Sequence, residues 1–400
     1  MPILKKIGYS YNDLTIVPAR ISKISSRSEC CPYVDNTNKL PLFTAPMSCV
    51  INEKNIDVWK NNGITPILPR TINLDIRLRY MCEEYWIAMS LGEFRTYFID
   101  GGIDLYDVTG NHLQHFRNNS NIKKYKVCID IANGHMESLY KMVMEAKKIA
   151  KTKNYELKIM TGNIANPETY AYLYGSGVDY IRVSIGSGNG CLTSSNTSVH
   201  YPIASLIDAC HEIRVHGDYI NYDNQYPKII ADGGIRNYSD IIKALALGAD
   251  YVMIGSLFAG FLESSADLYI SSANNEYREA NKELSTWFDE EINPDNKEKI
   301  KRKFLLFYSN RLYKKFYGMS TKKAQAEIAE AAGENKIKFK TSEGVEKMIP
   351  CIYTISQWVD NFISYLKSAM SYTGSNNLYE FKLRTNLIVN SPLEINSVNK

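Results

Sequence analysis

Short apolar runs rich in β-branched and aromatic residues recur along the first two thirds of the chain. Segments with helical periodicity separate most of them, at 137–150, 167–174, 203–215 and 239–247. This alternation is typical of parallel β/α units, and eight units favour a closed (β/α)₈ barrel over an open doubly wound sheet. The predicted strands occupy residues 41–46, 63–68, 86–90, 126–130, 157–161, 179–184, 228–232 and 250–254.

Polar residues and glycines follow these runs, at the end of a barrel where catalytic groups gather. The stretches "ADGGIRNYSD" and "MIGSLFAG" come after the seventh and eighth runs. Glycine N–H groups can approach a phosphate closely because no side chain intervenes. Each stretch alone could be an ordinary strand-to-helix turn, but the two together predict a phosphate site.

The loop "SIGSGNGCLTSSN", residues 184–196, holds three glycines, one cysteine and several hydroxyl residues. A dinucleotide-binding fingerprint starting at Gly186 and Gly188 would need its third glycine where Cys191 stands, so that reading is excluded. Among the cysteines, only Cys191 lies between glycines and hydroxyls, where backbone donors and solvent access support a thiolate. The loop therefore becomes a candidate carrier of a nucleophile.

Composition narrows the class of protein further. The chain has 400 residues, 44% hydrophobic and 22% charged, with a net charge of +4. Its lysines alternate with acids, so no nucleic-acid partner is predicted. The eight cysteines show no C-x-x-C spacing, which predicts neither a zinc site nor a disulfide framework. No apolar run approaches the ~18 residues of a membrane span, and the chain is predicted to be cytoplasmic with no membrane partner.

Several motifs resemble the IMP dehydrogenase and GMP reductase family, across most of residues 8–384. They are "YNDLTIVPAR", "SRSEC", "TAPMS", "DIANGH", "MTGNIANPE", "GSGNGCLT", "IIADGGIRNYSD", "YVMIGSLFAG", "YGMS" and "TSEG". The chain looks most like a GMP reductase, because the regulatory insertion common in IMP dehydrogenases has no room between "WIAMS" and "KVCID". The resemblance implies the same barrel fold.

The resemblance also implies the catalytic groups. Cys191 matches the cysteine that attacks C2 of the purine, and Thr193 matches a threonine that assists the proton chemistry. Glu343, in "FKTSEGVE", matches the glutamate that protonates the departing amine in GMP reductases. In many relatives the loop's carbonyls bind a monovalent cation such as K⁺, here those of Gly186, Gly188 and Cys191, although Ser187 and Ser194 depart from the family's pattern.

Ligand contacts carry over in the same way. Asp232 matches the carboxylate that accepts the ribose hydroxyls, and Gly234, Gly255, Ser256 and Tyr317 match phosphate contacts. The remaining substrate positions implied by the resemblance are Met47, Asn163, Gly318, Met319, Ser320, Lys340 and Ser342. The positions implied for the cofactor, NADPH or alternatively NADH, are Arg70, Asp130 and Asn133.

The expectation is a single barrel domain over about 40–265, with a flap over about 317–350 and a C-terminal segment at 351–400. Residues 271–311 exceed the family's length and predict a helical hairpin, because an N-P-D signal separates two helical stretches. The resemblance implies a homotetramer that binds a purine nucleoside monophosphate and deaminates GMP reductively to IMP and ammonia. IMP dehydrogenase, which converts IMP to XMP with NAD, and a non-catalytic purine-nucleotide-binding barrel are the alternatives.

Overall fold

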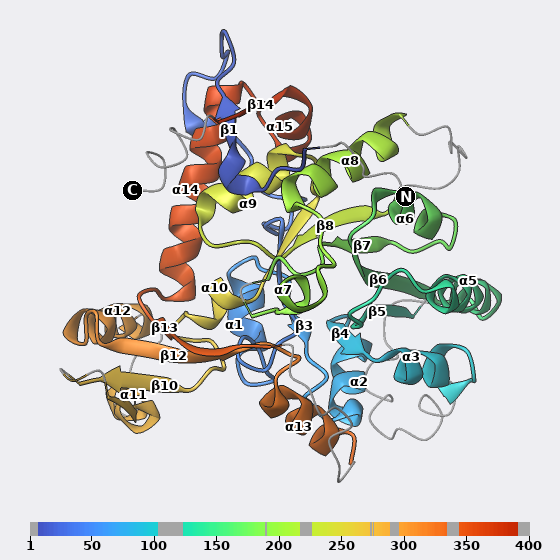
Figure 1. Cartoon of the computed structure of the whole chain (residues 1–400). Helices are drawn as coiled ribbons and strands as arrows, with labels where there is room; N and C mark the ends of the chain where they lie inside the picture. The colour runs from blue at the N-terminus through green and yellow to red at the C-terminus, as the bar shows by residue number, and fades with distance from the viewer. Residues whose placement is uncertain are drawn as a thin grey trace.

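Eight parallel strands form the centre of the computed structural model, which describes residues 7–102, 123–188, 190–216, 226–272, 274, 276–288, 296–333 and 344–390 (Figure 1). The strands are β2 (Leu42–Thr44), β3 (Ile67–Leu68), β4 (Trp86–Met89), β5 (Lys124–Ile129), β6 (Glu156–Ile164), β7 (Tyr180–Val183), β8 (Lys228–Asp232) and β9 (Tyr251–Ile254). Their order is β2-β9-β8-β7-β6-β5-β4-β3. Thr65, just before β3, exchanges backbone hydrogen bonds of 2.9 and 3.0 Å with Leu42 and Thr44, which closes the ring. The predicted (β/α)₈ barrel is confirmed.

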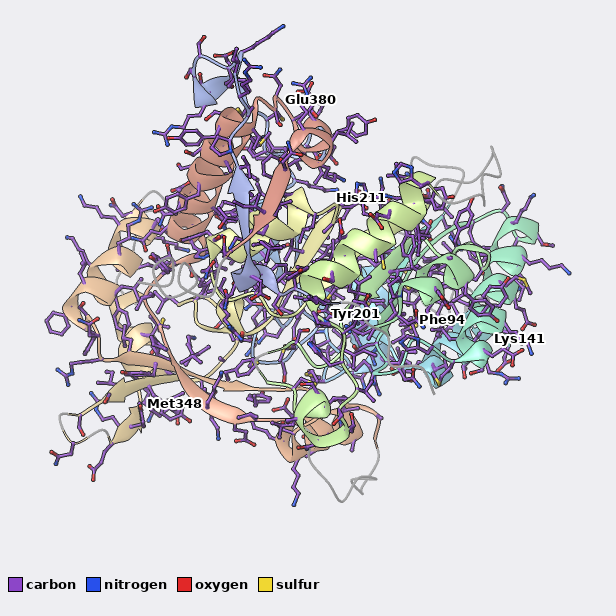
Figure 2. All side chains as sticks on the ribbon, turned by 45° about the horizontal axis from the view of Figure 1, so that its top comes forward. Phe94, Lys141, Tyr201, His211, Met348 and Glu380 are labelled. Carbon is purple, nitrogen blue, oxygen red and sulfur yellow. The ribbon has the colours of Figure 1, made fainter. Side chains whose placement is uncertain are left out.

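Helices cover the outside of this barrel. They are α1 (Ile56–Asn61), α2 (Leu74–Cys82), α3 (Leu91–Phe98), α5 (Glu137–Thr152), α6 (Pro167–Tyr174), α8 (Ile203–His216), α9 (Tyr238–Ala246) and α10 (Ser256–Ala259). Each presents an apolar stripe to the strands, as Phe94 and Lys141 illustrate in Figure 2: Phe94 of α3 is buried, whereas Lys141 of α5 is exposed and paired with Glu137 at 2.6 Å. The helix at 167–174 begins where Asn166 caps it and Pro167 occupies its first turn.

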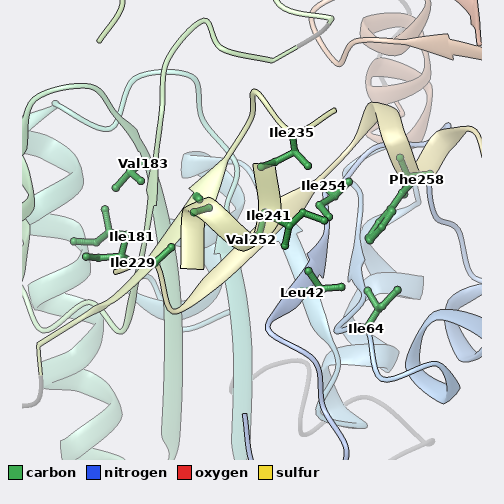
Figure 3. Packing of buried hydrophobic residues seen from close by; sticks show 14 of the residues in the cluster. Leu42, Ile64, Ile181, Val183, Ile229, Ile235, Ile241, Val252, Ile254 and Phe258 are labelled. Carbon is green, nitrogen blue, oxygen red and sulfur yellow. The ribbon is translucent and has the colours of Figure 1, made fainter. Parts of the chain in front are cut away.

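The core has two layers because alternate strand residues face opposite sides of the sheet. Ile230 of β8 points into the barrel, where it packs with Phe43, Trp86 and Met160. Its neighbour Ile229 belongs to the larger cluster between strands and helices, which Figure 3 shows from close by. Strands buried on both faces explain why the sequence shows continuous apolar runs rather than an alternating pattern.

A second, antiparallel sheet lies beside the barrel, in the order β11-β10-β12-β13. Its strands are β10 (Leu268–Ser271), β11 (Tyr277–Glu279), β12 (Leu312–Tyr317) and β13 (Glu346–Pro350). Two helices between β11 and β12, α11 (Asn281–Phe288) and α12 (Lys297–Phe307), occupy the segment predicted as a helical hairpin. The strand β11 within this segment was not predicted. Phe304 and Leu305 of α12 pack with Leu268 and Leu312 in a separate hydrophobic cluster.

The two ends of the described chain meet on the barrel's outer side. Strand β1 (Leu14–Val17), which follows the short helix η1 (Tyr11–Asp13), pairs antiparallel with β14 (Asn386–Val389). The remaining elements are η2 (Arg27–Glu29), α7 (Thr193–Thr197), α13 (Lys322–Ala331), α14 (Ile355–Thr373) and α15 (Leu378–Arg384). None of the helices in the described ranges is long and apolar enough to cross a membrane. The division of the chain into barrel, insertion, flap and C-terminal segment stays a prediction.

Candidate functional site

A cavity of about 820 Å³ opens at the carboxyl ends of the barrel strands. Loops after six of the eight strands contribute to its wall, β6 contributes Asn163 from within the strand, and the segment after β12 together with α13 contributes to another side. The volume lies in the range of pockets that hold small-molecule ligands. Sixteen predicted site residues line it: Met47, Arg70, Asp130, Asn133, Asn163, Gly186, Gly188, Cys191, Thr193, Asp232, Gly234, Gly255, Ser256, Gly318, Met319 and Ser320. Lys340, Ser342 and Glu343 lie outside the described residues.

Cys191 is held by the turn that follows β7. Its backbone N–H donates to Gly188 O at 3.0 Å, and its half-buried thiol donates to Thr193 Oγ1 at 3.2 Å. Gly344 forms an isolated antiparallel bridge with Cys191, and Val345 N donates to Gly190 O at 3.2 Å. The chain therefore passes beside the thiol immediately after position 343. A thiol with a hydroxyl at hydrogen-bond distance and access to a cavity can act as a nucleophile.

Arg182 of β7 joins the polar groups of four neighbouring strands. Its guanidinium donates from Nε to Asp232 Oδ2 at 3.0 Å and from Nη1 to Asp130 Oδ1 at 3.1 Å. Nη2 donates to Asn163 Oδ1 at 2.5 Å, while the Asn163 amide donates to Asp232 at 2.7 Å. Burial alone would lower the pKa of Arg182, but Cys128 and the two carboxylates outweigh it and raise that pKa. The side chain thus stays charged and fixes both aspartates.

Sequence reasoning missed Arg182. The residue lies inside the apolar run "DYIRVS", which was interpreted only as a strand. The available signal was the charge itself, because an arginine is almost never fully buried unless it is paired. At 7% exposure it needs partners, and the strand order supplies them from β5, β6 and β8.

The loop after β8 turns sharply at two glycines. Gly233 has φ +116° and Gly234 has φ +74°, values that side chains rarely adopt. After β9, a Cβ on Gly255 would lie only 2.8 Å from Met47 Sδ. The β8 loop therefore needs glycine for its backbone conformation, and at Gly255 any side chain would displace Met47. Bare backbone at both loops agrees with a cradle for a phosphate.

The residues predicted to contact the cofactor and the cation already form hydrogen bonds within the protein. Arg70 Nη1 donates to Asp130 O at 3.2 Å, and Asn133 Oδ1 accepts from His135 N at 3.0 Å. Among the proposed cation ligands, Gly186 O accepts from Ser194 Oγ at 2.9 Å and Gly188 O accepts from Cys191 N. Each carbonyl retains a second lone pair. The cation site and the cofactor contacts stay predictions.

Comparison with known proteins identifies the family. A family model described as "IMP dehydrogenase / GMP reductase domain" matches residues 100–287 and 302–396. The chain belongs to this family. The matched ranges contain Cys191 and Asp232, and the residues between them, 288–301, fall within the segment 271–311 that exceeded the expected length. The resemblance predicted from the motifs is confirmed.

Curated relatives carry two activity names. The GMP reductase of Caenorhabditis elegans is 29% identical over 266 residues, covering 66% of this chain and 58% of that protein. GMP reductase 2 of Bos taurus is 30% identical over 266 residues, with coverage of 66% and 60%. The inosine-5'-monophosphate dehydrogenase of Chlorobaculum parvum is 31% identical over 270 residues, with coverage of 66% and 44%. The chain thus spans less than two thirds of the length of these relatives.

Tyr317 departs from the position expected of a phosphate contact in this family. It is not among the cavity's lining residues, since its hydroxyl donates to Glu327 Oε1 at 2.9 Å and lies 3.0 Å from Ser48 Oγ. Burial raises the pKa of this phenol well above its usual value. Phe316 lines the cavity instead, because adjacent residues of a strand face opposite sides. The phosphate role of Tyr317 stays a prediction.

Proposed function

We propose that this member of the family is a GMP reductase, which catalyses GMP + NADPH + 2 H⁺ → IMP + NADP⁺ + NH₄⁺. The observation that carries the proposal is the Cys191 thiol, hydrogen-bonded to Thr193 in a cavity that also holds the fixed carboxylate of Asp232. Similarity to GMP reductases at about 30% identity supports it. Because the relatives include both GMP reductases and IMP dehydrogenases, the experiment has to establish which of the two reactions this protein catalyses.

Substrate binding follows from the polar groups of the cavity. Asp232 Oδ2 is occupied by Arg182 and Asn163, whereas no hydrogen bond from the described residues reaches Oδ1, which is left to accept the ribose hydroxyls. The backbone of Gly234, Gly255 and Ser256 would hold the phosphate. The base would lie against Met319 and its neighbours Gly318 and Ser320, which line the same cavity as Cys191.

The chemistry uses the thiol as nucleophile and later as leaving group. Cys191 Sγ forms a bond to C2 of the purine while the C2–N2 bond breaks. Thr193 and Glu343 pass a proton to the amine, which leaves as ammonia. NADPH, when bound, supplies the hydride that reduces C2, after which the C2–S bond breaks and the thiolate returns. A Glu343 relay is supported by the contact of Gly344, the next residue, with Cys191.

The wall beside the substrate suits a dihydronicotinamide. Arg70, Asp130 and Asn133 form a polar edge of the same cavity, and a carboxamide needs both donors and acceptors. NADH is the alternative reductant. A homotetramer and activation by K⁺ belong to the same proposal, and sedimentation and activity in K⁺ against Na⁺ would test them.

IMP dehydrogenase is the second candidate, because relatives with that name are equally similar. Hydrolysis of the covalent intermediate in that reaction uses a flap arginine in the relatives that the motifs resemble. This chain has no arginine between Arg311 and Arg384, and a lysine is a poor substitute as a base near neutrality. Its flap therefore favours the reductive direction.

Two absorbance assays separate the candidates. GMP with NADPH should yield IMP and ammonia, while IMP with NAD should yield XMP at least about a hundredfold more slowly, a barrier difference of roughly 3 kcal/mol. Efficient XMP formation would overturn the proposal and make Lys340 the candidate for activating water. Tight GMP binding without turnover of either substrate would favour the non-catalytic barrel.

A further inference from the structure

Two buried hydroxyls near the β8 loop have no hydrogen-bond partner. Tyr11 Oη and Ser187 Oγ are both closed off from solvent, and neither has a hydrogen-bond partner among the residues that the structure describes. Buried polar atoms are almost always paired, because an unmade hydrogen bond leaves the desolvation of the group uncompensated. Two such hydroxyls close together therefore indicate that a partner arrives from outside the protein.

Both side chains flank the same glycine. A Cβ built on Gly234 would lie 3.5 Å from Tyr11 Cε2, the ring carbon next to the hydroxyl-bearing carbon, and 3.7 Å from Ser187 Cβ. Tyr11 comes from η1, which contacts α9, whereas Ser187 comes from the loop after β7. Two segments far apart in sequence thus bring one side chain each to Gly234. Gly234 and Ser187 line the cavity, whereas Tyr11 packs against Gly234 and is not among the lining residues.

The nearby charged groups define what the partner must be. Asp240 already accepts hydrogen bonds from the backbone N–H groups of Arg236 and Asn237, at 2.8 and 3.3 Å. Burial, assisted by Asp240 and Asp232, raises the pKa of Tyr11 well above its usual value, so its phenol remains a donor. Ser187 likewise can donate. A partner for two donors beside a glycine N–H is an oxygen-rich acceptor, and a phosphate has three such oxygens.

The geometry points to Tyr11 and Ser187 as donors to the phosphate of the bound nucleotide, added to the backbone of Gly234. The identity of the nucleotide in this inference rests on the proposed function. The binding of a phosphate group by the two hydroxyls does not. Inorganic phosphate offers the same oxygens, so binding of that ion alone also reports on the two hydroxyls.

Titration calorimetry with GMP, guanosine and inorganic phosphate tests the assignment in Tyr11→Phe and Ser187→Ala. Each variant should bind GMP about tenfold more weakly, because a hydrogen bond to a charged group is lost. Guanosine, which lacks the phosphate, should bind variant and parent equally. Thermal unfolding without ligand should show Tyr11→Phe as stable as the parent or more stable, since it removes a hydroxyl that had no partner.

Tyr170→Phe is the matched control. Tyr170 is equally buried, but its hydroxyl donates a hydrogen bond of 2.6 Å to Pro227 O. Tyr170 is not among the residues that line the cavity. This variant should lose stability without ligand and keep the parent's affinity for GMP. If Tyr11→Phe behaves like this control, an internal water is its partner and the inference is wrong. If the parent protein binds inorganic phosphate but not GMP, the proposed function is wrong. The calorimetry with inorganic phosphate then still tests whether the two hydroxyls bind a phosphate.

Discussion

The two ends of the barrel both bury carboxylates beside cations, but they differ in what they leave unsatisfied. At the amino end of the strands, Asp250 accepts from Arg214 at 2.5 Å, from Lys382 at 2.6 Å and from Ile229 N at 2.9 Å. Asp179 at the same end accepts from Lys147 and from Ile159 N. These carboxylates use protein partners alone.

The carboxyl end also has a cluster of hydrogen-bonded charged and polar side chains, around Arg182. It differs in that some of its polar groups have no partner among the described residues. Asp232 lines the cavity with Oδ1 free of hydrogen bonds from the described part of the chain, which also offers no partner to the hydroxyls of Tyr11 and Ser187. From this difference we expect the amino end to contribute mainly to the stability of the barrel and the carboxyl end mainly to ligand binding. Substitutions at the two ends should therefore affect different measurements.

The largest effect is expected at the thiol. Cys191→Ala should lower kcat to less than about one thousandth of the parent value, a loss of roughly 4 kcal/mol, because no other group can form the bond to C2. Affinity for GMP should change little, since the phosphate and ribose contacts remain. Stopped-flow assays and calorimetry measure the two quantities. Cys31→Ala, at an exposed cysteine, is the control; comparable losses in both variants would remove Cys191 from the reaction.

At the opposite end, Asp250→Ala should lower the free energy of unfolding by about 3–5 kcal/mol, because it leaves Arg214 and Lys382 without their shared carboxylate. Urea unfolding measures the change. The folded fraction should keep its kcat and its affinity for GMP. An exposed pair gives the control, since Glu137→Gln should cause no measurable change. Lost affinity for GMP in folded Asp250→Ala would break the proposed division between the two ends.

Asp232→Ala should weaken GMP binding by about 2–4 kcal/mol, because the ribose hydroxyls lose a charged acceptor. Its effect on unfolding should be smaller than that of Asp250→Ala, since Arg182 keeps Asp130 as a partner. Calorimetry and urea unfolding on both variants rank the two effects. The opposite ranking, with stability lost and binding retained, would show that Asp232 serves the structure rather than the ligand.

The smallest effect concerns His211, which projects from α8 (Figure 2) and lies 2.8 Å from Arg214. Burial, together with Arg214 and Lys382, lowers the pKa of His211 to about 4. The unfolded chain binds the proton near pH 6.5, so stability should be full above that pH and fall progressively down to about pH 4. Urea unfolding at a series of pH values measures this slope. His211→Asn should flatten it, and an unchanged slope would assign the titration to another group.

Much of the fold could be predicted because barrel strands are buried on both faces and so produce continuous apolar runs. Each of the eight runs became a strand, and the helix predicted over 167–174 has those bounds. Strand β11 could not be found in the same way. All three of its residues, Tyr277–Glu279, are exposed, so no pattern of burial marks them in the sequence.

Residue types alone were enough to select Cys191 among glycines, and the structure places it at the cavity, while its catalytic role stays a prediction. The role of Arg182 depends instead on the order of strands, because Asp130 and Asp232 reach it from β5 and β8. Tyr317 shows a third limit. Its motif predicted the residue, but the side of β12 that it faces was settled by its hydrogen bonds with Ser48 and Glu327.

The pairing of β1 with β14 bears on how the chain is completed during translation. Thr15 Oγ1 donates to Asn390 Oδ1, a contact that spans 375 positions, and Lys382 reaches Asp250 from the same late segment. A nascent chain therefore carries β1 as an unpaired edge strand, and Asp250 without Lys382, until residues 382–390 have left the ribosome tunnel. The barrel therefore gains its complete set of described contacts only after this late segment has emerged.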